Sequence, residues 1–108
     1  MEAKDTPSAR RFSLEKMQKI NLLETERMFA DLYCLEPGQE QKVHSHGGAD
    51  KVYFVLEGTG RFRIGDEERD LGPRHIVLAP ADVEHGVWNL SGERLALLVF
   101  MAPNPNKR

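Results

Sequence analysis

The sequence predicts an all-β fold of the sandwich or barrel kind in a single domain. About eight to ten short apolar or alternating runs are separated by turn signals every ~8 to 12 residues. The 108 residues are the usual length of one domain, and 40% hydrophobic residues are enough for one core. We see no internal repeat, so we expect an arm at residues 1–11, a barrel at 12–102 and a tail at 103–108.

The N-terminal quarter of the chain gives the weakest signal. Residues 1–11 combine charge with Pro7 and Ser8 and show no apolar periodicity, which predicts a flexible arm. In residues 12–26, the spacing of apolar positions such as Phe12 and Ile20 fits either a helical stripe or two short strands.

Strand signals become frequent from Arg27 onward. Residues 28–35 form an apolar run that ends at Glu36-Pro37-Gly38, a composition that favours a turn. Residues 52–56 are a second apolar run. A hairpin follows, because Phe62 and Ile64 alternate with arginines and Gly65-Asp66 makes a two-residue turn into residues 67–71.

The C-terminal third adds three more strands. Residues 76–79 form a buried strand that Pro80 stops. Residues 87–90 and 95–101 flank a segment, 91–94, that has the composition of a hairpin loop. The tail at 103–108 is polar and contains two prolines, so it lacks material for a core.

Charge and composition exclude several classes of protein. The net charge is −2, from 15 basic and 17 acidic residues, so we expect no nucleic-acid partner. No apolar run approaches the ~20 residues of a membrane span, and Met1 to Arg11 has no signal-peptide core. We therefore expect a cytoplasmic protein without a membrane partner. The single Cys34, in an apolar run, is expected to pack in the core.

Histidines supply the candidate site. His44 and His46 are two residues apart, a spacing that places both imidazoles on one face of a strand. His85 is a candidate for a third ligand. Neutral imidazole suits zinc, iron, nickel and copper, and three protein ligands leave a position open for water or substrate.

The order of these histidines and the turn residues around them resembles the two motifs of the cupin family. The resemblance covers residues 38–89, in the pattern Gly38-x5-His44-x-His46, then Gly58, then Pro80-x4-His85-x3-Asn89. It implies an antiparallel double-stranded β-helix, or jelly-roll barrel, and strands rather than a helix in residues 12–26. It also implies that His44, His46 and His85 hold a divalent transition metal such as Fe, Mn, Ni or Zn.

The sequence departs from the family pattern at three places. Lys51 stands where the family has a metal-binding Glu, and the neighbouring acid Asp50 has the opposite strand parity. Arg74-His75 replaces a Gly-Asp pair, and Asp82 replaces a glycine. The last two differences fall in turns, so we expect altered loops around an intact barrel.

Two functions are consistent with this resemblance. The first is a metal-binding cupin with dioxygenase or isomerase activity on a small organic acid or sugar derivative. The second is a non-enzymatic ligand-binding or sensor barrel, with or without metal, in which Lys51 contacts an anionic group. We also expect a homodimer, because barrel edges and one sheet face need cover, with Phe12, Leu14 and Ile20 contributing.

Overall fold

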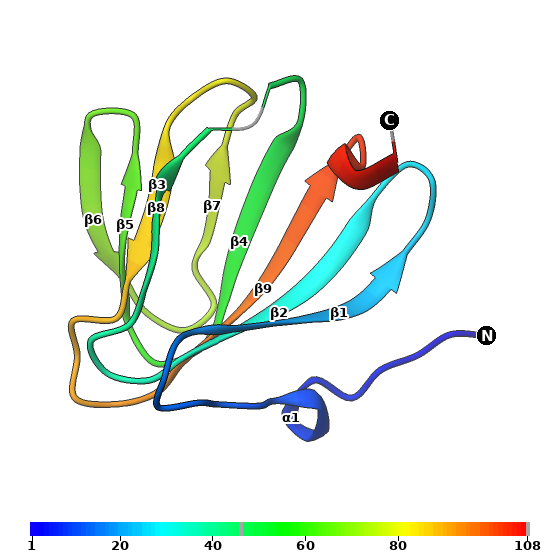
Figure 1. Ribbon diagram of the computed structural model, residues 1–108. Coiled ribbons are helices and arrows are strands. Elements are labelled where there is room, and N and C mark those ends of the chain that lie inside the picture. The colour runs from blue at the N-terminus through cyan, green and yellow to red at the C-terminus, as the bar shows by residue number, and fades with distance from the viewer. Residues whose placement is uncertain (46, 108) are drawn as a thin grey trace.

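The computed structural model describes residues 1–45 and 47–107, and in them nine strands form two facing antiparallel sheets (Figure 1). The large sheet has the order β1–β2–β9–β4–β7 and the small sheet the order β3–β8–β5–β6, with every pairing antiparallel. This is the predicted jelly-roll. The strands are β1 Gln18–Glu24, β2 Phe29–Leu35, β3 Glu40–His44, β4 Asp50–Glu57, β5 Gly60–Ile64, β6 Glu67–Leu71, β7 Ile76–Ala79, β8 His85–Trp88 and β9 Leu95–Ala102.

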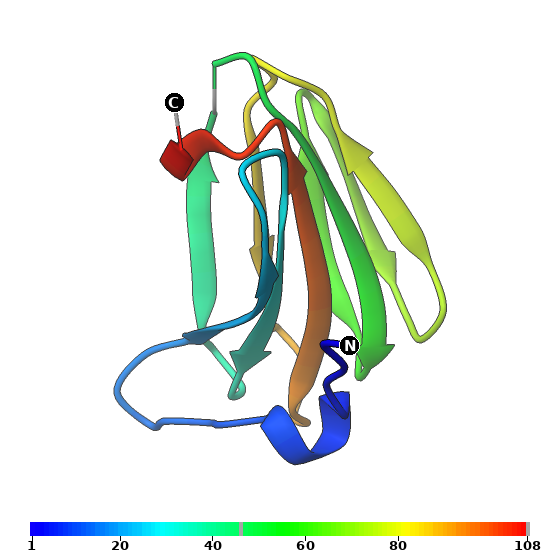
Figure 2. The same ribbon diagram turned by 90° about the vertical axis from the view of Figure 1, so that its right-hand side faces the viewer.

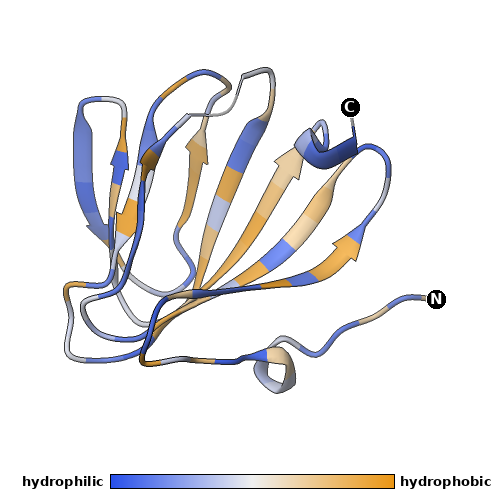
Figure 3. Ribbon diagram, viewed as in Figure 1, coloured by the Kyte–Doolittle hydropathy of each residue, from blue (hydrophilic) through white to orange (hydrophobic). Residues whose placement is uncertain are grey.

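The core lies between the two sheets because alternate side chains of each strand point inward. In β4, for example, Tyr53 and Val55 are buried and their neighbours are partly exposed. The principal core cluster consists of Tyr33, Leu35, Tyr53, Val55, Phe62, Leu71, Ala79, Val87, Leu95, Leu97 and Val99. Hydropathy follows the same division, since β2 and β9 are mostly hydrophobic and β6 is mostly hydrophilic (Figure 3).

The connections between strands confirm one turn prediction and correct another. Gly65-Asp66 joins β5 to β6 as predicted, with Ile64 opposite Glu67 and Gly65 at a φ of 59°. The expected hairpin across residues 91–94 is wrong. The strands on its two sides, β8 and β9, belong to different sheets, so this loop crosses the barrel. Composition alone does not separate these two kinds of loop.

Asn89 holds this crossing loop in place. Its side chain is fully buried, and the amide nitrogen donates to the carbonyl oxygens of Leu35 and Glu93 at 3.0 and 2.7 Å. The amide oxygen accepts from both the backbone nitrogen and the hydroxyl of Ser91. All of the polar atoms of this amide are therefore used in ordering the loop.

The backbone conformation at position 58 explains why the motif has a glycine there. Gly58 has a φ of 83°, and a Cβ there would overlap the carbonyl oxygen of Arg94. Two other left-handed positions carry side chains, Arg74 at a φ of 71° and Asp82 at 69°. The family pattern has a glycine at each of these two positions, and the barrel forms with Arg74 and Asp82 in their place.

The N-terminal segment lies on the outer face of the large sheet (Figure 2). It contains a short helix, α1 Thr6–Ala9, and Arg10, whose guanidinium pairs with Glu57 at 3.0 Å. Ala9 and Phe12 pack against the outward side chains of β1 and β2. At the other terminus, a single 3₁₀ turn, η1 Pro105–Lys107, ends the described chain. None of the described helices is long and apolar enough to cross a membrane.

Candidate functional site

A β-bulge places His44 beside His85. The register between β3 and β8 shifts between Gln41 and His44, so Gln41 and His44 both face the interior although they are three residues apart. His44 then lies opposite His85, with 4.4 Å between ring centroids and 59° between ring planes. His85 is 2% exposed, and His44 is half-buried near the open end of the barrel.

The bulge depends on a glycine in the neighbouring strand. A Cβ on Gly86 would lie 2.9 Å from the carbonyl oxygen of Gln41 and 3.0 Å from the backbone nitrogen of Val43. The absent side chain lets the bulged backbone of β3 approach β8. The pairing of His44 with His85 therefore rests on Gly86.

Hydrogen bonds to backbone carbonyls set the tautomer of both imidazoles. His44 Nδ1 lies 2.7 Å from the carbonyl oxygen of Lys42, and His85 Nδ1 lies 2.9 Å from that of Val83. A carbonyl oxygen only accepts, so each neutral ring carries its proton on Nδ1 and its lone pair on Nε2. This is the arrangement in which histidine ligates metals through Nε2. Burial also lowers the pKa of His44, which favours the neutral form.

The described residues supply two of the three predicted metal ligands. His46, the third, lies outside the described residues. Within residues 1–45 and 47–107, no group of three His, Cys, Asp or Glu side chains is arranged to hold a metal ion. The adjacent, Nδ1-protonated His44 and His85 fit two positions of a metal centre.

Lys51 lies in a polar cage inside the barrel. It is 1% exposed, and its Nζ donates to Gln41 Oε1 at 3.2 Å. The same Nζ lies 5.2 Å from the ring centroid of Tyr33 and 5.0 Å from that of Tyr53, within the range of cation–π contacts. Among the described residues, none of the ion pairs involves Lys51. The ammonium group is thus held by one neutral amide and two aromatic rings.

Gln41 links Lys51 to the two tyrosines of this cage by hydrogen bonds. Its Oε1 accepts from both Lys51 Nζ and the Tyr53 hydroxyl, the latter at 2.6 Å, and its Nε2 donates to the Tyr33 hydroxyl at 3.0 Å. Tyr53 also makes an edge contact with the His85 ring, with centroids 6.2 Å apart. The lysine cage and the histidine pair therefore share one wall.

Burial perturbs the charges of this region. Desolvation, together with the positive charge of Lys19, lowers the pKa of Lys51 to about 7. Asp31, on the same inward face of the large sheet, partly opposes this shift, and burial raises its own pKa. Burial also raises the pKa of Tyr33 and of Tyr53, so both phenols stay neutral. A lysine that titrates near neutrality inside a barrel can bind an anion or accept a proton.

The other residues named from the sequence do not take part in the histidine pair or the lysine cage. Asp50 is exposed on the opposite side of β4 from Lys51 and accepts from the backbone nitrogen of Ala81. His75 is exposed in the turn before β7. Cys34 is fully buried, as expected of a core residue.

Sequence reasoning missed Gln41, Tyr33 and Tyr53. Tyr53 could have been found, because it shares strand parity with Lys51 two residues earlier. Gln41 could not, because a regular strand would point it to the face opposite His44.

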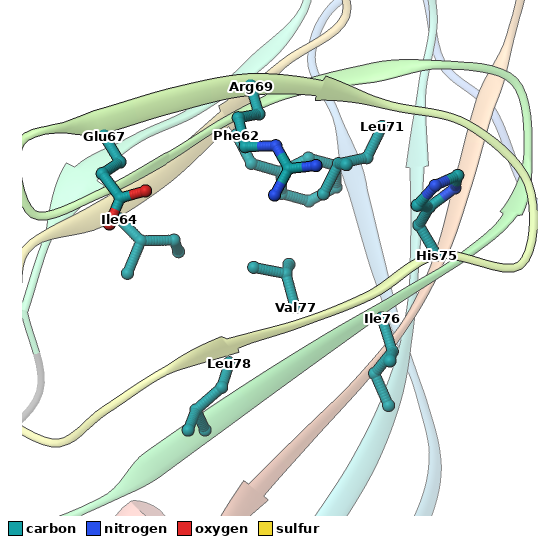
Figure 4. Close-up of a pocket in the computed structure, with 9 residues that line it drawn as sticks. All are labelled: Phe62, Ile64, Glu67, Arg69, Leu71, His75, Ile76, Val77 and Leu78. Atoms are coloured by element: carbon teal, nitrogen blue, oxygen red, sulfur yellow. The ribbon is translucent and has the colours of Figure 1, made fainter.

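A separate pocket of about 240 Å³ opens at the seam between the two sheets, where β6 faces β7 (Figure 4). Its floor is apolar, and the side chains of Glu67 and Arg69 extend from β6 toward it. Among the described residues that line it, none is a predicted site residue. Ile64, at one end, lies opposite His85 in the β5–β8 register, so the pocket ends one strand away from the histidine pair.

Comparison with known proteins gives one family and several structural relatives. Residues 31–101 match the family model described as the cupin domain. The structure of TT1209 from Thermus thermophilus is 50% identical and superposes with a TM-score of 0.93, covering 95% of this chain and 98% of that one. An RmlC-like cupin protein from Desulfovibrio desulfuricans is 28% identical with a TM-score of 0.85, over 95% and 97% of the two chains.

One relative has a named activity. A 5-nitrosalicylic acid 1,2-dioxygenase from Bradyrhizobium sp is 29% identical, over 71% of this chain. The match covers 41% of the dioxygenase, so this chain spans less than half of that relative's length.

Proposed function

The chain belongs to the cupin family, and on that premise we propose that it binds a divalent transition metal and a small organic acid at the histidine end of the barrel. His44, His46 and His85 are the metal ligands, and Lys51 is the contact for an anionic group of the ligand. The observation that carries the proposal is the adjacent pair of imidazoles, one buried and one half-buried, with ring centroids 4.4 Å apart and both protonated on Nδ1.

A bound divalent metal would supply Lewis acidity and, if it is redox-active, reactivity toward dioxygen. The residues of this chain orient the metal ligands and shield the site from water. Carbonyl oxygens orient the two imidazoles, and Tyr53, Phe62 and Val87 exclude water from one side of the site. The similarity to a 5-nitrosalicylic acid 1,2-dioxygenase supports an aromatic or other small carboxylate as the ligand.

Lys51 sets the electrostatics of the proposed site. An ammonium near a divalent metal is unfavourable, at about 4 kcal/mol per unit charge at 4 Å with an effective dielectric near 20. The lowered pKa of Lys51, about 7, reduces this conflict because the amine is partly neutral at physiological pH. An incoming carboxylate would favour the protonated form again, which makes Lys51 a partner for anions.

The metal assignment is tested by elemental analysis of protein purified without an affinity tag. We expect about one divalent transition metal per chain in the wild type, and a loss of most of it in His46→Ala and His85→Ala. His75→Ala is the matched control, since this histidine is exposed and lies in a turn of the chain away from the site. Binding should weaken as the pH falls toward ~6, because imidazole must be neutral to ligate. Full occupancy in both site variants, or none in the wild type, would contradict the assignment.

The role of Lys51 is tested by charge reversal. In Lys51→Glu, metal should bind tighter by roughly a factor of ten or more, because a repelling cation is replaced by a carboxylate. Binding of salicylate or glucuronate to the metal-free protein should be lost in the same variant and retained in Lys42→Glu, where the lysine is exposed on β3. If both affinities are unchanged in Lys51→Glu, the proposed role of Lys51 is wrong.

A non-enzymatic ligand-binding or sensor barrel is the second candidate function. The lysine cage favours it, because it forms an anion contact that needs no metal. This function would be supported over an enzymatic one if the metal-free protein binds salicylate or glucuronate and the metal-loaded protein does not convert the same compound.

A further inference from the structure

The pocket at the seam between β6 and β7 has two opposite charges on its β6 side. Glu67 and Arg69 share strand parity with the buried Leu71, so they belong to the inward side of the edge strand β6. Figure 4 shows both side chains directed toward the pocket. Their register partners on β5 are the apolar Ile64 and Phe62. Inward positions of a sandwich strand are usually apolar, and these two positions depart from that pattern.

Neither charge is neutralised within the chain. Among residues 1–45 and 47–107, none of the ion pairs involves Glu67 or Arg69. On the outer face of the same strand, by contrast, Asp70 accepts two hydrogen bonds from Arg61. The carboxylate and the guanidinium beside the pocket are therefore available to a ligand.

An apolar floor adjoins the two charges. The pocket has a volume of about 240 Å³, and Phe62, Ile64, Leu71 and Val77 line it. Phe62 and Leu71 belong to the principal core cluster, and Ile64 and Val77 pack against it, so the floor is held in place by the core. Pockets for drug-sized ligands measure ~300–1,000 Å³, so this pocket suits a smaller molecule.

We propose that the seam pocket binds a free α-amino acid with a large apolar side chain, such as phenylalanine or leucine. Arg69 binds the α-carboxylate through its planar fork of donors. Glu67 accepts hydrogen bonds from the α-ammonium group, and the apolar side chain lies on the floor of the pocket.

The arrangement of the two charges favours a zwitterion. Residues two apart on a strand have their Cα atoms about 7 Å apart, and both side chains are long enough for their tips to reach groups bonded to one carbon. A ligand with a carboxylate alone would bring its charge close to Glu67, and an amine alone would bring its charge close to Arg69. An amino acid meets an opposite charge at each of its two groups. The lysine cage offers a cation alone, so the two sites select different ligands.

The seam pocket is separate from the proposed metal centre. Glu67 and Arg69 lie on β6, whereas His44 and His85 lie on β3 and β8, and β5 stands between β8 and β6. Binding at the seam is therefore tested on the metal-free protein. Failure of the metal assignment would leave this proposal standing, and failure of this proposal would leave the metal assignment standing.

The experiment is a titration of the metal-free protein with phenylalanine and with leucine, in the presence of a chelator, followed by NMR of its amide and methyl groups. Saturable shifts are expected at Leu71 and Val77, with a dissociation constant on the order of 1 mM. Phenylpropionate and phenylethylamine each lack one of the two charged groups. Each should bind at the seam at least roughly fivefold more weakly than phenylalanine.

Charge-removing variants identify the contacts. Glu67→Gln and Arg69→Gln should each weaken phenylalanine binding by roughly five- to tenfold, because each removes a charge-assisted hydrogen bond. Glu68→Gln is the matched control and should bind as the wild type does, since Glu68 is exposed on the same strand with the opposite parity. All three positions are exposed, so the variants should keep the wild-type circular dichroism.

Several results would overturn the proposal. These are phenylpropionate binding at the seam as tightly as phenylalanine, unchanged binding in both Glu67→Gln and Arg69→Gln, or shifts confined to the cage of Lys51. The absence of saturable shifts up to roughly 20 mM ligand would also overturn it. The inward charges of β6 would then serve only to keep this edge strand from pairing with other chains.

Discussion

Replacing Lys51 by methionine should stabilise the metal-free protein, and far more at pH 6 than at pH 10. Lys51 is 1% exposed and has a neutral amide as its hydrogen-bond acceptor. Methionine has a similar length, carries no charge and adapts to irregular space, so the cage should accept it.

The magnitude follows from the pKa of Lys51. Burial lowers this pKa from 10.5 to about 7, and each unit corresponds to about 1.4 kcal/mol. The unfolded chain therefore holds more protons than the folded protein between pH 7 and pH 10.5, and wild-type stability rises with pH across this window. Below pH 7 the folded protein bears the full cost of the buried charge, on the order of 5 kcal/mol.

The variant avoids this cost but loses the hydrogen bond to Gln41, which contributes about 1 kcal/mol. We therefore expect Lys51→Met to be more stable than the wild type by about 3 to 4 kcal/mol at pH 6 and by less than about 1 kcal/mol at pH 10. Lys42→Met, at an exposed position on β3, should change stability little at either pH.

The assay is urea unfolding followed by circular dichroism and by the fluorescence of Trp88, with a chelator present at both pH values. A gain that is equal at the two pH values would mean that packing and not charge is responsible. A loss of stability at pH 6 would refute the reasoning, because it would show that the buried ammonium is well compensated.

Three further substitutions test the backbone. Gly58→Ala should destabilise by about 3 kcal/mol or more in urea unfolding, because its Cβ would overlap the carbonyl oxygen of Arg94 at a left-handed φ; a change below about 1 kcal/mol would contradict the structure. Gly86→Ala should displace the bulge of β3 through the carbonyl oxygen of Gln41, and should lower metal affinity by roughly tenfold or more; unchanged affinity would show that the bulge is not required. Arg74→Gly should raise thermal stability slightly, by about 0.5 to 1 kcal/mol, since glycine adopts a φ of 71° without strain, and a loss would argue against strain there.

Much of the fold was predictable because local signals agree with the tertiary structure. Short alternating runs and turn signals predicted an all-β fold, and the resemblance to the cupin motifs predicted the jelly-roll. The β5–β6 hairpin lies where the two-residue turn predicted it. The loop at 91–94 was misassigned because sheet membership depends on long-range pairing, which composition does not encode.

The site was predictable only in its residue types. His44 and His85 come together through a bulge in β3 that the sequence did not predict. The two-residue spacing predicted that His44 and His46 share one face of a strand, and His46 lies outside the described residues. The burial of Lys51 follows from the parity of β4, yet its cage needs Gln41, whose inward position depends on the same bulge. An irregularity of one residue leaves no clear trace in hydrophobic periodicity.

The position of β9 in the large sheet bears on how the chain can be made. This strand is the last of the nine, and it pairs with β2 on one side and β4 on the other. During synthesis from the N-terminus, β2 and β4 are complete long before the strand that joins them exists. A nascent or truncated chain ending before residue 95 would present two apolar strands with open edges, the kind of surface to which chaperones bind. Productive folding of this barrel therefore waits for β9.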